Sequence, residues 1–136
     1  MKIKTALISV SDKNGLSSIL KILKKYKINI ISSGGTYNKI KSLGYKCVEI
    51  SEFTEFPEIL DGRVKTLHPK IHSGILFKRQ SNLHKKTLKK KKFESIDLVI
   101  SNFYPFRKTL NEKKNHENII ENIDIGGPTL VRSAAK

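Results

Sequence analysis

The feature that most constrains the fold is a strand–turn–helix pattern that occurs twice before Gly44. Residues 4–10 form a short β-rich apolar run, and a polar turn then leads into apolar residues at helical spacing over 16–26. Residues 28–31 form a second apolar run, and a helix expected over 36–43 ends at Gly44. Such strands are typical of a parallel sheet that helices cover on both faces. The pattern predicts an α/β fold, a Rossmann-like parallel sheet flanked by helices.

The rest of the chain continues with strand and helix patterns, among which an apolar run rich in β-branched and aromatic residues is the strongest strand. A proline suits the first turn of the last helix. The expected elements are a strand at 45–50, turns or a short helix at 51–60, a strand at 71–77, a lysine-rich helix at 85–92, the strongest strand at 95–106, a weak helix at 116–123, and a helix at 129–136 behind Pro128.

The length of 136 residues suits a single domain. There is no apolar run near the ~20 residues of a membrane span, and the apolar part of the N-terminus is too short for a secretory signal, so a soluble cytoplasmic protein is expected. Cys47, which has no second cysteine to pair with, is predicted to be a core-facing strand residue. The four histidines do not fall into a metal-ligand spacing, which predicts no metal site.

The formal net charge of +15 would attract a phosphate backbone, but we do not expect nucleic-acid binding. Of the 27 basic residues, 23 are lysine, which indicates a bias across the whole chain. The densest run, 85–92, contains no aromatic residue to stack on a base and no arginine to read a base edge. A solvated helix face is the simpler interpretation.

The Ser/Gly-rich turn after the second strand is the first candidate binding site. Backbone N–H groups at a helix N-terminus favour a bound anion, and phosphate is the obvious candidate. An ordinary turn of an α/β fold also needs glycine and serine, so that alternative stays open. Polar residues follow the first strand at the matching edge of the sheet, where ligands of open α/β sheets collect. The residues expected at this site are Ser11, Lys13, Ser33, Gly34, Gly35 and Thr36.

The segment 61–69 is the second candidate. If it is extended, as the residue before a proline favours, Arg63 and Lys65 share one face. Two adjacent cations call for an anion, and an arginine can bind a carboxylate or phosphate through two parallel hydrogen bonds. A surface loop without a function could have the same composition.

Two further groups of polar residues complete the candidates. Asn102 and Tyr104 follow the strongest strand on alternate positions of one face. Asp124 precedes a second Gly-Gly turn, at Gly126 and Gly127.

Several motifs together show a resemblance to a known family. The chain resembles the N-terminal inosine monophosphate (IMP) cyclohydrolase domain of the bifunctional purine-biosynthesis enzyme that also carries a formyltransferase domain. The motifs are Ile-Ser-Val-Ser-Asp-Lys at 8–13, Ser-Gly-Gly-Thr at 33–36, Asp-Gly-Arg-Val-Lys-Thr-Leu-His-Pro at 61–69, Asn-Phe-Tyr-Pro-Phe at 102–106, Ile-Asp-Ile-Gly-Gly-Pro-Thr at 123–129 and Arg-Ser-Ala-Ala-Lys at 132–136.

The resemblance implies a methylglyoxal-synthase-like fold and ring closure of 5-formamidoimidazole-4-carboxamide ribonucleotide to IMP with loss of water. It implies no metal and no organic cofactor. Catalysis would fall to Lys65, Tyr104, Asp124 and Lys136. Substrate and its phosphate would be bound by Ser11, Lys13, Ser33, Gly34, Gly35, Thr36, Arg63, Thr66, Asn102, Ile125, Gly126 and Gly127.

The resemblance also has implications for the extent of the domain and for its partners. It implies that residues 1–136 are the cyclohydrolase domain, incomplete at its C-terminal end because family members continue further. It implies a purine ribonucleotide substrate, a homodimer, and a formyltransferase domain in the same or a separate chain, with no nucleic acid and no membrane. The alternatives are methylglyoxal synthase, a regulatory nucleotide-binding domain of this fold, and an inactive fragment of the bifunctional enzyme.

Overall fold

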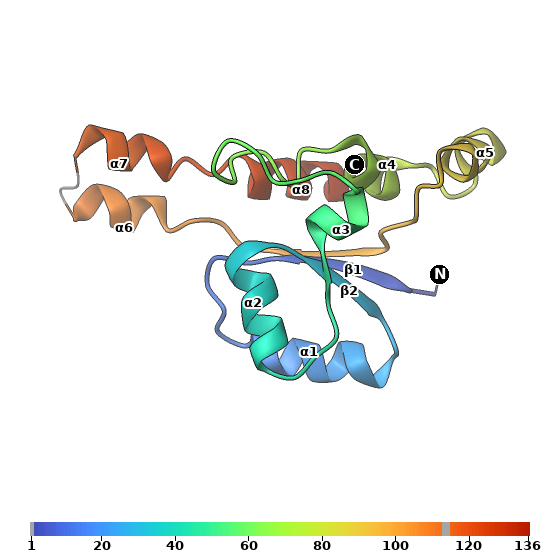
Figure 1. The fold of residues 1–136 in the computed structure, drawn as a ribbon, viewed down its shortest axis with the longest axis horizontal. Coiled ribbons are helices and arrows are strands. Elements are labelled where there is room, and N and C mark those ends of the chain that lie inside the picture. Colours follow the sequence, from blue (N-terminus) through green and yellow to red (C-terminus); the bar gives the residue numbers. More distant parts are fainter. Residues whose placement is uncertain (1, 113–114) are drawn as a thin grey trace.

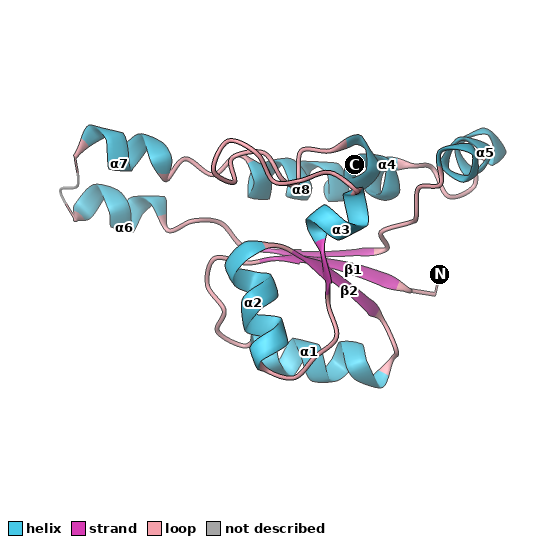
Figure 2. Cartoon of the chain, in the orientation of Figure 1, coloured by secondary structure: helices cyan, strands magenta, loops and turns pink. Residues whose placement is uncertain are grey.

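The structure, a computed structural model, describes residues 2–112 and 115–136. Within them, four parallel strands form one sheet in the order β3-β2-β1-β4 (Figures 1 and 2). β1 (Thr5–Ser9) lies between β2 (Asn29–Ser32) and β4 (Leu98–Ser101), and β3 (Val48–Glu49) pairs with β2. Since the chain continues from β1 to β2 on one side and β4 pairs on the other, the strand order reverses at β1. Ligands of open α/β sheets bind at the carboxyl ends of the strands at such a point.

Helices cover both faces of the sheet, as Figure 1 shows. One face carries α1 (Leu16–Lys25) and α2 (Gly34–Ser42). The opposite face carries α3 (Ile50–Thr54), α4 (Pro69–Leu76) and α8 (Gly126–Ala135). The remaining described helices lie beyond the ends of the sheet: α5 (Asn82–Lys91), α6 (Phe106–Asn111) and α7 (His116–Glu121). No described helix has the length and apolar character needed to cross a membrane.

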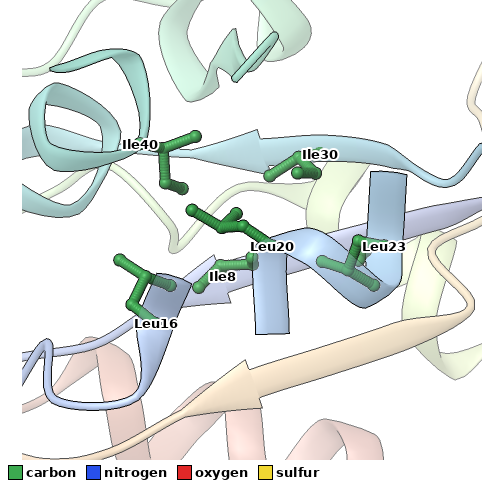
Figure 3. Packing of buried hydrophobic residues seen from close by; sticks show 7 residues of the cluster. Ile8, Leu16, Leu20, Leu23, Ile30 and Ile40 are labelled. Carbon is green, nitrogen blue, oxygen red and sulfur yellow. The ribbon is translucent and has the colours of Figure 1, made fainter. Parts of the chain in front are cut away.

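Two apolar clusters hold these layers together, because successive strand side chains point to opposite faces. Ile8 faces α1 and α2, whereas Leu7 faces α3, α4 and α8. Full burial of one such side chain contributes about 1.5–3 kcal/mol. The first cluster, shown in Figure 3, contains Ala6, Ile8, Leu16, Leu20, Leu23, Ile30 and Ile40. The second contains Leu7, Ile31, Ile50, Ile71, Ile96 and Leu130.

The fold class predicted from the sequence is confirmed: a parallel sheet flanked by helices. The first two strands and the helices expected at 16–26, 36–43, 85–92 and 116–123 are present with shifted ends. The mixed segment 51–60 contains the short helix α3.

The strand predicted at 71–77 is wrong, because these residues belong to helix α4. Pro69 occupies the first turn, and Nδ1 of His68 accepts a hydrogen bond from the N–H of Lys70, 3.1 Å away, which caps the helix. Ile71 and Ile75 pack against the second cluster. Their spacing of four residues is helical, although the run is also short and apolar enough to fit a buried strand.

Other predicted boundaries are also corrected. The strand expected at 45–50 shortens to Val48–Glu49, and the one at 95–106 shortens to Leu98–Ser101. The helix expected from residue 129 already begins at Gly126. Cys47 lies just before β3 and is half-buried against the first cluster, and burial raises the pKa of its thiol to about 11. A thiol with so high a pKa is a poor nucleophile at neutral pH.

Candidate functional site: a pocket at the carboxyl ends of the strands

A pocket of about 650 Å³ lies where β1, β2 and β4 end. Its wall is completed by the first turns of α2 and α8, by the segment 61–66, and by the end of α7 with the residues that follow it. The lining residues are Ser9, Val10, Ser11, Lys13, Ser33, Gly34, Gly35, Thr36, Asp61, Gly62, Arg63, Lys65, Thr66, Asn102, Tyr104, Ile120, Glu121, Ile123, Asp124, Ile125, Gly126 and Gly127.

The N-terminus of α2 forms one end of the pocket. Ser33 is the N-cap residue, and the first N–H groups of the helix have no acceptor in a preceding turn. Thr36 is buried, and its hydroxyl donates to the carbonyl of Val10 (2.8 Å) and accepts from the N–H of Val10 (3.2 Å). These two bonds fix the start of α2 against the end of β1. Thr36 therefore positions the start of α2, and its hydroxyl is already engaged with the main chain of Val10.

The loop after β1 places Lys13 beside this helix end. The Lys13 ammonium donates to the carbonyl of Ser11 (3.1 Å) and lies 3.7 Å from the position that a Cβ atom at Gly35 would occupy. Asn102 holds the loop from the end of β4: its Oδ1 accepts from the N–H of Ser11 (2.7 Å), and its Nδ2 donates to the carbonyl of Asp12 (2.8 Å). Asn102, predicted to bind substrate, thus fixes the loop that presents Lys13.

The segment 61–69 begins in a tight turn within residues 59–64, so its first part is not extended, whereas His68, the residue before the proline, is extended as expected. Ile59 and Val64 form an antiparallel bridge in which each N–H donates to the other's carbonyl. Gly62 closes the turn with a φ of 85°, a conformation that residues with a Cβ atom rarely adopt. A Cβ atom at Gly62 would lie 2.5 Å from Oε1 of Glu58.

The turn directs two cations toward the pocket, each with a carboxylate partner. Nζ of Lys65 lies 3.6 Å from Oε2 of Glu58 and 3.6 Å from the position of a Cβ atom at Gly34. This places the Lys65 ammonium near the N-terminus of α2. Arg63 forms an ion pair with Glu121, the last residue of α7. Thr66 is buried, and its hydroxyl oxygen lies 2.8 Å from the position of a Cβ atom at Gly126.

Asp124 connects β4 to α8 through its carboxylate. Oδ1 accepts from the N–H of Gly127 (2.9 Å), and Oδ2 accepts from the N–H of Tyr104 (3.3 Å). The bond to the residue three positions later is the usual helix-capping pattern. A Cβ atom at Gly127 would lie 2.7 Å from Oδ2, so only glycine allows this approach. Each carboxylate oxygen retains a second lone pair that can accept a bond from a ligand.

The pocket brings together every residue predicted for the site except Lys136. Lys136 follows the last residue of α8, a ten-residue helix whose first turn lines the pocket, and is therefore roughly 15 Å further along the helix axis. The structure thus does not place Lys136 with the other predicted catalytic residues. Whether the collected residues catalyse or bind as predicted remains a prediction.

Several lining residues were not predicted. The missed residues are Ser9, Val10, Asp61, Gly62, Ile120, Glu121 and Ile123. Ser9 and Val10 end the first strand, and Asp61 and Gly62 belong to the segment already singled out, so their positions could have indicated them. Nothing in the sequence joins Glu121 to Arg63, 58 residues earlier.

The charges of the pocket wall are mixed. Lys13, Arg63 and Lys65 supply cations, and Asp61, Glu121 and Asp124 supply carboxylates. Among the described residues, no group of three or more His, Cys, Asp or Glu side chains could hold a metal ion. The arrangement suits an anionic ligand that also carries hydrogen-bond donors.

Comparisons with known proteins identify the family of the chain. The profile described as "MGS-like domain" matches residues 15–129. The chain is 53% identical over 133 residues to the bifunctional purine biosynthesis protein PurH of Clostridioides difficile (strain 630), and 50% identical over 137 residues to that of Elusimicrobium minutum (strain Pei191). These alignments cover 98% and 99% of this chain but 26% of each relative, so the chain spans about a quarter of their length.

A solved structure shows the same architecture. The crystal structure of ForH superposes with a TM-score of 0.78 at 28% sequence identity, covering 98% of this chain and 68% of that chain.

Proposed function

This chain belongs to the MGS-like domain family, and we propose that it is an IMP cyclohydrolase domain acting in purine biosynthesis. The reaction is the dehydrative ring closure of 5-formamidoimidazole-4-carboxamide ribonucleotide to IMP, and residues 1–136 belong to the domain that would carry it out. The observation that carries the proposal is that one pocket combines an anion site built on a helix N-terminus with Lys65, Tyr104 and Asp124. The relatives named above are bifunctional purine biosynthesis proteins, which supports the substrate class.

The 5′-phosphate binds at the N-terminus of α2. The N–H groups of Gly34 and Gly35 and the helix dipole favour an anion there, and Lys13 adds a positive charge. Fixing the phosphate at the N-terminus of α2 restricts the base to the rest of the pocket, which Lys65, Tyr104 and Asp124 line. Holding the two reacting groups of one molecule in contact lowers the entropic cost of ring closure.

Ring closure forms a bond between the carboxamide nitrogen and the formyl carbon. The carbonyl electrons move to the formyl oxygen, and Lys65 stabilises the negative charge that develops there. Asp124 accepts a proton from the attacking nitrogen. Tyr104 lies beside Asp124, because the main-chain N–H of Tyr104 donates to Oδ2 of that carboxylate. The alkoxide oxygen takes up the proton that Asp124 accepted. It leaves as water after gaining a second one, while the formamido nitrogen loses its N–H proton and forms the C=N bond of the new ring.

A cyclisation assay with the formylated ribotide tests this proposal. Lys65→Ala removes the charge at the oxyanion and is expected to slow the enzymatic reaction about 10²–10³-fold. Asp124→Asn is preferable to alanine because the amide oxygen can still accept from the N–H of Gly127, which preserves the helix cap. A loss of about 10²–10⁴-fold is expected for this variant. Lys21→Ala, at an exposed position on α1, is the matched control and should keep the wild-type rate.

Two outcomes contradict the proposal. A folded wild-type chain with no rate above the spontaneous reaction would show that this chain is not a cyclohydrolase. Binding of IMP without turnover would instead indicate a regulatory nucleotide-binding domain of the same fold. Circular dichroism of each variant verifies that the protein is folded.

The proposal extends to partners. Since the relatives are bifunctional and about four times as long, we expect a formyltransferase unit, in the same or a separate chain, to supply the substrate. We also expect a homodimer, which sedimentation analysis can test.

A further inference from the structure

The ion pair between Arg63 and Glu121 crosses the pocket wall. Arg63 lies in the turn closed by the Ile59–Val64 bridge, whereas Glu121 ends α7, and both line the pocket. The Nη2 atom of Arg63 donates to Oε2 of Glu121. The side chains are 64% and 56% exposed, so water and solutes can reach the pair.

The carboxylate of Glu121 accepts from Nη2 of Arg63, a donor that an anionic ligand would also use. A guanidinium offers planar N–H donors that match a carboxylate or a phosphate equally well. The neighbouring cation, Lys65, has a separate partner in Glu58, and Lys13 donates to main-chain carbonyls. Arg63 is therefore the pocket cation whose carboxylate partner comes from a different part of the wall, the end of α7.

We propose that Glu121 is an internal competitor that the anionic group of the ligand displaces from Arg63. The inference rests on the proposed function in that the ligand is a purine ribonucleotide. Glu121 thereby lowers the affinity of the pocket for its ligand and helps to set which anions bind. A weakly charged ligand cannot displace the carboxylate, whereas a phosphate dianion, which the other pocket cations also attract, can.

Displacement is feasible because the ion pair is exposed. Pairs of this kind contribute little to stability, since water screens the charges and the side chains lose conformational freedom. Exchanging one anion for another at Arg63 also avoids leaving the guanidinium without a partner. The expected effect on affinity is correspondingly modest, about two- to fivefold.

The experiment measures IMP binding by titration calorimetry in Glu121→Gln, which removes the competing charge with little change in shape. Glu117→Gln is the matched control, because it removes the same charge from the same helix but does not line the pocket. Both substitutions are repeated in an Arg63→Gln background to separate competition from a general change in charge. In parallel, the rate at which phenylglyoxal modifies Arg63 is followed by peptide mass spectrometry, with and without inorganic phosphate.

The following results are expected together. Glu121→Gln binds IMP about two- to fivefold more tightly than wild type, Glu117→Gln does not, and the gain disappears in the Arg63→Gln background. Arg63 is also modified faster in Glu121→Gln, and less phosphate is needed to protect it. The proposal is overturned if Glu121→Gln binds IMP equally or more weakly with Arg63 present, or if the gain persists without Arg63.

Failure of the proposed function gives a different pattern. If the folded wild type binds no IMP, the nucleotide assignment is wrong. The protection of Arg63 from phenylglyoxal by inorganic phosphate then tests whether Glu121 competes with anions for Arg63. Stronger protection in Glu121→Gln than in wild type supports competition, and equal protection overturns it.

Discussion

Gly62 lies where the pocket wall leaves no room for a side chain. Its φ is 85°, and a Cβ atom would lie 2.5 Å from Oε1 of Glu58 and 3.3 Å from Nζ of Lys65. The residue therefore has two separate reasons to be glycine: the backbone conformation and the position of the Glu58–Lys65 pair. A suitable control can separate these two effects.

We expect Gly62→Ala to impair both stability and ligand binding. The left-handed conformation costs a residue with a Cβ atom about 1–2 kcal/mol, and the added methyl group displaces Glu58 and moves Lys65. Gly44→Ala is the control, because Gly44 has a similar φ of 79° but no atom within 4 Å of the added Cβ. Urea unfolding should show similar losses of stability in both variants, whereas IMP binding should weaken only in Gly62→Ala. Equal binding by the two variants would contradict the role assigned to this contact.

At the scale of elements, α4 and α8 meet through a partly buried polar contact. Nδ1 of His72 in α4 lies 2.9 Å from Oγ of Ser133 in α8. Burial lowers the pKa of His72 below its usual 6.5, although the main chain of Thr66 partly opposes this shift. Thr66 lines the pocket, so this contact lies directly behind the functional wall.

The lowered pKa of His72 predicts how stability depends on pH. Because the folded state holds His72 neutral, the unfolded chain binds the proton first as the pH falls below about 6.5. The free energy of unfolding should therefore decrease on acidification from about pH 7 and level off once the pH is below the folded-state pKa. Urea unfolding between pH 7.5 and roughly 5.5 measures this slope. His72→Gln should flatten it, and His116→Gln, at an exposed position in α7, should not. An unchanged slope in His72→Gln would refute the assignment.

The elements also show what local sequence can predict. Turn chemistry located the starts of α2 and α8 approximately, because glycine and serine requirements are local. It placed the two Gly-Gly pairs in turns, whereas they belong to the first turns of these helices. The segment 71–77 was wrongly predicted because a short apolar run fits either a strand or a helix, and packing against β4 and α8 is not a local property. The pairing of Arg63 with Glu121 depends on how α7 lies against the pocket, and no pattern near either residue contains that information.

At the scale of the whole molecule, the net charge of +15 acts on stability more than on the site. Lysines at exposed positions repel one another, and two adjacent ones, Lys85 and Lys86, lie on the exposed surface of α5. The screening length falls from about 30 Å at 0.01 M salt to about 10 Å at 0.1 M. Added salt should therefore stabilise the protein.

We expect the melting temperature, measured by circular dichroism, to rise as the NaCl concentration increases from about 0.01 M to about 0.1 M. The double variant Lys85→Gln/Lys86→Gln should melt at a higher temperature than wild type at low salt and respond less to NaCl. The double variant with arginine at both positions keeps the charge and should behave as wild type does. If the glutamine variant shows the full salt response, repulsion at these positions is not the cause.

The anion site at the N-terminus of α2 is built largely from main-chain groups, and this has a consequence for how the fold can change. If the proposed roles hold, exchanging Lys65, Tyr104 and Asp124 would alter what happens to a bound molecule but would keep the N–H groups of Gly34 and Gly35 that we propose bind its phosphate. The scaffold therefore separates recognition from reactivity. New chemistry could arise on such a chain by substitution at a few positions, while a phosphorylated ligand remains anchored throughout.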